Sequence, residues 1–255
     1  MKRPVLNILR IAAIAVLAAG FVLLALLSRK ARFERTCEGV RVEFSDDFNF
    51  VTEDDIKGYI GRFSGNYIGR RLDSLDLDGI ENMLNNQSAV LKSEVYTTGD
   101  GILHAKIWQR EPVLRFQGPD GGFYVDDRGF IFPLQDNYTS LVPVIDGDIP
   151  VKVSSGYKGE ARNSKEAAWI KGVQELTDYM KVNAIWAENI VQIHVDENSD
   201  IILVPREGPE TFIFGSPDDI PEKFSRIEKY YQYIKPGEKE YTSVNVKYKG
   251  QIICK

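Results

Sequence analysis

The side chains that most often perform catalysis are carboxylates, histidines and thiols, and this chain groups few of them together. Asp46-Asp47 ends a strand-like run, and three further pairs of adjacent aspartates occur, at residues 54–55, 126–127 and 218–219. Paired carboxylates can share acid–base chemistry only when both point into one site, and adjacent residues of a turn or helix cap point apart. The three pairs are therefore interpreted, in chain order, as first-turn helix charges, turn residues and helix-cap residues.

The histidines and cysteines do not form a recognisable metal or redox motif. His104 and His194 lie in separate strand-like runs, and neither has a second histidine or a cysteine at ligand spacing. Cys37 and Cys254 are too few for a disulfide framework and form no CxxC motif. A Cys37–Cys254 disulfide would require a close approach of their Cα atoms, which spacing alone does not establish; two free thiols are the alternative.

Motif and charge analysis points away from an enzyme. GxSxG, Walker and HExxH motifs are absent from the sequence. The net charge is −5 and no basic stripe runs through the polar part of the chain, which disfavours nucleic acid as a partner. We predict a protein with no catalytic residue, metal, cofactor or small-molecule substrate, which acts by binding other proteins.

The elements that position such a binding surface begin with an uncharged apolar segment, Ile11–Leu27. At about 1.5 Å per residue it reaches roughly 25 Å, and Val5–Leu9 with a snorkelling Arg10 extends it toward the ~30 Å of a bilayer core. We predict a cytoplasmic tail at residues 1–10 and a transmembrane helix at residues 11–28. A cleaved signal peptide, whose apolar run is typically shorter, and a buried core helix are the alternatives.

The orientation of this helix does not follow from charge, because basic residues flank both of its ends. The next part of the chain, residues 38–111, has a β-α-α-β-β pattern. Val40–Phe44 alternates apolar and polar residues, Thr52 is placed to cap a first helix, and Asp78 begins a second. Two further strands, over residues 90–97 and 102–109, are joined by the Gly-Asp-Gly turn at 99–101.

The order of these motifs resembles a POTRA domain of the FtsQ/DivIB cell-division family. The matching stretches are VRVEF, FVTEDDI, LDLDGIENML, VLKSEVY and GILHAKIWQREPVLRF. Ser88-Ala89 departs from the family pattern, which commonly has proline before the second strand. The resemblance implies a single membrane helix with the N-terminus in the cytoplasm and the bulk of the chain outside, in the periplasmic or extracytoplasmic space of the cell inner membrane.

Residues 112–255 have the pattern of a β-rich domain. The stretch YVDDRGFIFPL and the later LVPVIDGDIP resemble the start of the second domain of FtsQ-like proteins. Apolar residues spaced by three and four predict two helices, one from Asn163 or Ser164 to about Lys181 and one from Asp218 or Asp219 to Ile234. The predicted fold class is α+β: a transmembrane helix, a βααββ POTRA domain, and a mixed β-sheet domain with two flanking helices.

The resemblance implies a non-enzymatic scaffold with one membrane helix, which recruits FtsB/FtsL-like division proteins to the septum. Partner contacts in the family cluster at the last helix and last strands, where strand addition to an exposed sheet edge is the mechanism we expect. By position, the predicted partner-binding residues are Tyr230, Tyr233, Val244, Val246, Tyr248, Gln251, Ile252 and Ile253.

The sequence also fits one alternative for the site and one for the function. Val244 and Val246 could instead be core residues that the tyrosines cover, and Asn245 and Lys247 replace an Asp and an Arg of the family pattern. A contact that needs a bidentate arginine would be weaker with Lys247. The alternative function is that of a POTRA-containing envelope protein that handles polypeptides in outer-membrane transport or assembly, although repeated POTRA domains and barrel strands are not visible in this sequence.

Overall fold

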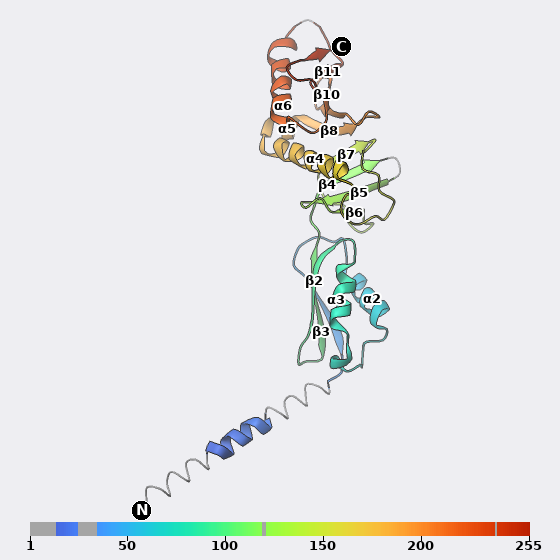
Figure 1. The fold of residues 1–255 in the computed structure, drawn as a ribbon, viewed down its shortest axis with the longest axis vertical. Helices are drawn as coiled ribbons and strands as arrows, with labels where there is room; N and C mark the ends of the chain where they lie inside the picture. The colour runs from blue at the N-terminus through green and yellow to red at the C-terminus, as the bar shows by residue number, and fades with distance from the viewer. Residues whose placement is uncertain (1–13, 25–34, 119–120, 238) are drawn as a thin grey trace, which may run out of the picture. The chain divides into compact units, whose positions relative to one another are not determined.

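The computed structural model describes residues 14–24, 35–118, 121–237 and 239–255 (Figure 1). The chain divides into two compact units, Met1–Gln109 and Arg110–Lys255. Residues 14–24 are helical. Within the described ranges, no helix has both the length and the apolar character needed to cross a membrane. The predicted tail at 1–10 and both ends of the predicted transmembrane helix, 11–13 and 25–28, lie outside the described residues.

The first unit has the predicted β-α-α-β-β order. Its elements are β1 (Gly39–Phe44), α2 (Glu53–Ser64), the single 3₁₀ turn η1 (Leu72–Ser74), α3 (Leu77–Asn85), β2 (Val90–Thr97) and β3 (Ile102–Gln109). The described strands form a sheet in the order β1-β3-β2, with β1 parallel and β2 antiparallel to β3. Strand β2 therefore lies at one edge of this sheet.

Local sequence signals explain the two helices of this unit. Thr52 caps α2 through a reciprocal pair of bonds: its hydroxyl accepts from the backbone N–H of Asp55, whose carboxylate accepts from the N–H of Thr52. Asp76 caps α3 by accepting from the N–H of Gly79. Ile80 and Leu84 of α3 are fully buried, which fixes the face that α3 turns to the core.

The second unit is built on one mixed sheet. Its described strands run in the order β12-β11-β10-β9-β8-β7-β4-β5-β6, with parallel pairs at β4–β7, β7–β8 and β10–β11. The α+β class and the large mixed sheet predicted from the sequence are confirmed. The strands are β4 (Pro112–Gly118), β5 (Gly121–Asp126), β6 (Ile131–Pro133), β7 (Val144–Gly147), β8 (Ile190–Val195), β9 (Ile201–Pro205), β10 (Thr211–Gly215), β11 (Ser243–Asn245) and β12 (Ile253–Cys254).

Helices pack against this sheet and complete its core (Figure 1). They are α4 (Ser164–Val182), α5 (Ala184–Asn189), α6 (Ile220–Lys229) and η2 (Tyr230–Ile234). Val173 and Leu176 of α4 and Phe224 of α6 are fully buried in the same cluster as Phe212 and Phe214 of β10. Burial of this apolar surface is what holds α6 beside the last strands of the sheet.

The structure corrects the prediction that Asp218 or Asp219 caps α6. Asp219 holds the N-cap position, but its side chain makes no capping bond and its φ is 45°. Asp218 instead pairs with the buried ammonium group of Lys223, which also donates to the carbonyl of Ser216 at 2.7 Å. Lys223, in the first turn of α6, therefore fixes the chain that leads into this helix.

The structure also gives Asp126 a larger role than that of a turn residue. Its side chain is 3% exposed and pairs with Arg110 at 2.9 Å. Its carboxylate also accepts from the N–H groups of Arg128 and Phe130. A buried carboxylate needs such partners, so this aspartate holds the β5–β6 hairpin together.

Candidate partner-binding surface

The terminal strand β12 forms one edge of the large sheet. It pairs only with β11 among the described strands. Ser243 and Lys255 exchange two backbone hydrogen bonds, at 3.2 and 2.9 Å. Because bonded and non-bonded pairs alternate in an antiparallel ladder, the peptide groups of Cys254 and Ile252 point away from β11. The outer side of β12 is therefore an open edge, with no described strand paired to it.

The eight predicted partner-binding residues separate into a buried group and a surface group. The buried residues are Val244 and Val246, both 0% exposed, and Tyr230, which is 2% exposed. The surface residues are Tyr233, Tyr248, Gln251, Ile252 and Ile253, of which Tyr233 is 78% and Tyr248 is 49% exposed. The two valines are thus core residues that support the edge from beneath, and only the surface group offers side chains to a partner.

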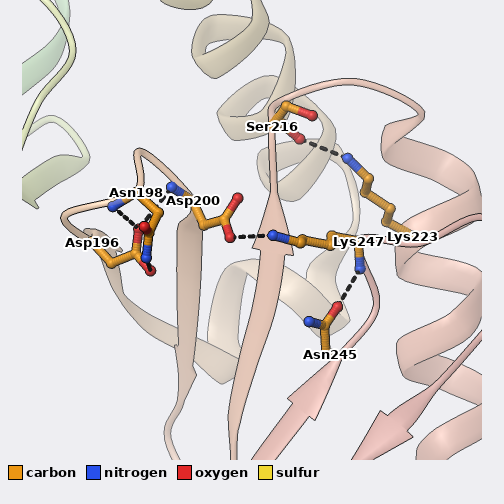
Figure 2. Close-up of polar contacts among 7 residues, drawn as sticks. All are labelled: Asp196, Asn198, Asp200, Ser216, Lys223, Asn245 and Lys247. Carbon is orange, nitrogen blue, oxygen red and sulfur yellow. Dashed lines mark hydrogen bonds and ion pairs between the residues drawn. The ribbon is translucent and has the colours of Figure 1, made fainter.

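A polar network fixes the segment that joins β11 to β12 (Figure 2). Lys247 Nζ lies 2.6 Å from a carboxylate oxygen of Asp200, the residue just before β9. That hydrogen bond raises the pKa of Lys247 above its ordinary value. Asp196 shapes the turn before β9 by accepting from the N–H groups of Asn198 and Asp200, both at 2.9 Å. The β8–β9 turn therefore holds the chain just before Tyr248.

The two residues that depart from the family pattern both have local partners here. The side-chain oxygen of Asn245 accepts from the N–H of Lys247 at 3.0 Å (Figure 2). Gly215 lies beneath Lys247 with a φ of +80°, and a Cβ at this glycine would come within 2.6 Å of Lys247 Cβ. Glycine is therefore required at 215 both for its backbone conformation and for space.

Helix α6 also holds the strand that supports the open edge. Arg226, 8% exposed, donates from Nε to the carbonyl of Val246 at 2.9 Å. The N–H of Val246 donates to Ile213 of β10 at 3.0 Å. The N–H and the C=O of Val246, the residue directly after β11, therefore both bond to the core side of the sheet, away from β12. These bonds anchor β11, whereas the outer edge of β12 is not paired with any described strand.

The π-helical turn η2 follows α6 and carries three tyrosines. Its widened turn is closed by a bond from the N–H of Lys235 to the carbonyl of Tyr230 at 2.9 Å. Tyr230 packs edge-on against Phe212, and burial, then the carboxylate of Glu210, raises its pKa to about 12. Tyr230 therefore supports the core as a neutral group, whereas Tyr233 of the same turn lies on the surface.

Strand β2 forms an edge of the first unit, and side chains cap it. The N–H of Ser93 donates to Asn85 Oδ1 at 2.6 Å, and the N–H of Val95 donates to Glu81 Oε2 at 3.0 Å. Both acceptors come from α3. These two N–H groups point away from β3, so α3 occupies positions that an added strand would need.

The cysteines and acidic residues do not assemble a redox or metal centre in the described ranges. Cys37 is buried, Cys254 is half-buried, and both are free thiols. Burial raises the pKa of each thiol, which lowers its reactivity. No group of three or more His, Cys, Asp or Glu side chains that could hold a metal ion occurs within the part of the chain that the structure describes.

Comparison with known families assigns each of the two units to a known type of domain. Residues 35–108 match a POTRA-like domain, so the first unit is POTRA-like. Residues 111–255 match the family described as "FtsQ/DivIB, C-terminal related". The chain therefore belongs to the FtsQ/DivIB family, which confirms the resemblance found in the sequence. No curated protein matches the chain.

Proposed function

We propose that this chain is a non-enzymatic scaffold of the bacterial division machinery, which holds FtsB/FtsL-like partners by strand addition to β12. Membership of the FtsQ/DivIB family supports a division role that rests on protein–protein interactions. The observation that carries the finer proposal is the open outer edge of β12, where the peptide groups of Ile252 and Cys254 point away from β11.

Strand addition would combine backbone hydrogen bonds to a partner strand with side-chain contacts beside that strand. A partner strand would exchange hydrogen bonds with Ile252 and Cys254, each worth about 1 kcal/mol net. Ile253 lies on β12 and is 40% exposed, so a cross-strand side chain can cover it. Tyr248 of the β11–β12 connection and Tyr233 of η2 are large exposed rings, which would supply apolar area to the same partner.

The proposal includes a membrane anchor. Residues 11–28 would form a single transmembrane helix of the cell inner membrane, with residues 1–10 in the cytoplasm and the two domains in the periplasmic or extracytoplasmic space. The uncharged run Ile11–Leu27 and the helix at residues 14–24 support this assignment. An extracytoplasmic domain anchored in this way would meet partners that carry their own membrane helix in the same plane.

The alternative function, polypeptide handling in outer-membrane transport or assembly, would use a free edge of the POTRA-like domain. In this chain the outward N–H groups of Ser93 and Val95 are already bonded to Asn85 and Glu81. A passing polypeptide would have to break both bonds before it could add to β2. These bonds disfavour strand addition at the β2 edge, one of the two edges of this sheet.

The test is a pair of substitutions at one edge residue. Cys254→Pro removes the outward N–H of β12 and leaves the bonds of Ile253 and Lys255 to β11, since proline is tolerated at an edge whose N–H faces outward. Cys254→Ala keeps that N–H and changes only the side chain. The full chain would be co-expressed with FtsB/FtsL-like partners and purified from membranes.

We expect Cys254→Ala to retain the partners. With Cys254→Pro, partner recovery should fall at least about tenfold, since the outward N–H is lost and the proline ring hinders the close approach of a partner strand. Circular dichroism must show both variants folded. Equal recovery by both folded variants would place the contact elsewhere. A wild-type chain that recovers no division partner would remove the main support for the scaffold itself.

A further inference from the structure

A cavity of about 330 Å³ opens on the helical side of the second unit, and none of its lining residues belongs to β12. Its walls come from α5, the end of β9, α6 and η2. Trp186 and Pro205 are buried there, Tyr231 is half-buried, and the ring of Trp186 is backed by Phe224 at 4.8 Å. A volume near the lower end of the range for ligand pockets suits one large apolar side chain.

Apolar surface continues from this cavity onto the exterior. Ile185 lines the cavity and is 61% exposed, and Val182, three residues before it, is 85% exposed. Exposed aliphatic side chains beside a cavity are typical of a surface that a larger partner covers. A small molecule in the cavity would leave the outer part of Ile185 in water, whereas a polypeptide segment would cover it.

The charges around the cavity indicate which charged side chains a bound polypeptide segment would carry. Glu207 and Glu228 line its mouth, are exposed, and form no ion pair with any described residue. The cation that lines the cavity is already neutralised: Lys235 Nζ lies 2.5 Å from the buried carboxylate of Glu210 and 4.8 Å from the centre of the Tyr231 ring. The cavity therefore presents two free carboxylates around an apolar interior.

We propose that this cavity, the α5–η2 pocket, is a second protein-docking site, which takes a partner segment carrying one large apolar side chain flanked by lysine or arginine. The apolar side chain fills the space between Trp186 and Tyr231. The basic flanks pair with Glu207 and Glu228. The pocket shares no residue with β12, so the site is independent of the strand-addition proposal.

The probe is a matched pair of alanine-based helical peptides, each with one central phenylalanine. In one peptide lysines flank the phenylalanine, and in the other glutamates replace them. Fluorescence anisotropy of each labelled peptide would be measured against the purified full chain in detergent. Charge complementarity predicts that the lysine peptide binds at least about tenfold more tightly, and that this difference shrinks as salt is raised.

Three variants locate the site and test its charge. Ile185→Asp puts a charge on an exposed position of the pocket, and Leu141→Asp is its matched control, since Leu141 is 101% exposed and lies outside the pocket. Glu228→Lys reverses one rim charge. We expect Ile185→Asp to weaken the lysine peptide about tenfold, Leu141→Asp to leave it unchanged, and Glu228→Lys to shift preference toward the glutamate peptide.

Several results would overturn the proposal. Equal affinity for the two peptides, or no binding of either at about 1 mM, would remove the charge argument and the site with it. Equal effects of Ile185→Asp and Leu141→Asp would place any binding outside the pocket. None of these results bears on β12, so a failure here leaves the scaffold proposal to be judged by its own test.

Discussion

The β2 edge of the POTRA-like domain and the β12 edge of the second domain look equivalent in a strand diagram, yet their exposed backbone groups differ. At β2, Asn85 and Glu81 of α3 accept from the outward N–H groups of Ser93 and Val95. At β12, no described residue pairs with the outward peptide groups of Ile252 and Cys254. A neighbouring helix therefore decides whether an edge strand can accept another strand.

Single side chains are therefore enough to protect a sheet edge from pairing with another strand. Natural proteins blunt sheet edges because unpaired N–H and C=O groups invite pairing with other chains. In the first unit this protection comes from two acceptors, one turn apart on α3. An edge left open beside a well-anchored strand is then a feature to explain, and the proposed addition of a partner strand would explain it.

The largest predicted effect concerns the support beneath the open edge. Val246→Glu places a carboxylate at a position that is 0% exposed, within the apolar cluster that also holds Phe212 and Phe214. We expect the free energy of unfolding of the second domain to fall by more than about 3 kcal/mol. Urea denaturation followed by circular dichroism measures this. A change below about 1 kcal/mol would mean that Val246, the residue directly after β11, is not part of the core.

A second prediction concerns the two α3 side chains that accept from the outward N–H groups of β2. The double substitution Glu81→Ala with Asn85→Ala leaves the N–H groups of Ser93 and Val95 without their acceptors, at a cost of about 1 kcal/mol each. We also expect self-association that rises with protein concentration, seen by sedimentation velocity. The control, Glu81→Gln with Asn85→Asp, keeps both acceptor oxygens and should stay monodisperse to the same degree as wild type.

A smaller effect is expected at the ion pair that holds the β11–β12 connection. Lys247→Ala should lower the unfolding free energy by less than about 1 kcal/mol, because the pair is partly exposed. The folded-state pKa of Lys247 is raised by its bond to Asp200. Its contribution is therefore fully present below about pH 10, the ordinary lysine range, and is lost as pH rises through the raised pKa.

The measurement for this pair is the stability difference between wild type and Lys247→Ala, followed from pH 8 to pH 11. The difference should stay constant at the lower pH values and shrink at the highest. A difference that grows with pH would contradict the ion pair, since the sign of the linkage would then be reversed.

The smallest stability effects are predicted for the exposed tyrosines. Tyr233→Ala and Tyr248→Ala should change the unfolding free energy by about 0.5 kcal/mol or less. Recovery of division partners should nevertheless fall several-fold, because each removes an exposed ring of the proposed partner surface. Tyr96→Ala is the matched control: Tyr96 lies on the capped strand β2 and is 42% exposed, so its removal should leave partner recovery unchanged.

Much of the fold follows from sequence signals that act locally. The capping box at Thr52 and Asp55 and the apolar periodicity of α4 and α6 are local patterns, and each of these elements forms where it was expected. The family resemblance then supplied the order of the domains. The prediction that the last strands lie together at a sheet edge also follows from that order.

The candidate site could be predicted only in part, because burial and long-range bonds are set by tertiary packing. Sequence spacing could not tell that Val244 and Val246 face the core while Ile253 faces solvent. The roles of Arg226 and Glu81 were missed, since each bonds to a backbone group on a strand distant in sequence. A charged residue beside the apolar positions of α6 was the one available signal for Arg226.

The most direct test of the contrast between the two edges is residue-resolved amide hydrogen exchange on the full chain without partners. We predict slow exchange at Ser93 and Val95 and fast exchange at Ile252 and Cys254. The N–H groups of Ile253 and Lys255, which face β11, should exchange more slowly than their neighbours and so control for fraying. Protection of Cys254 equal to that of Ser93, or fast exchange at both Ser93 and Val95, would contradict the account.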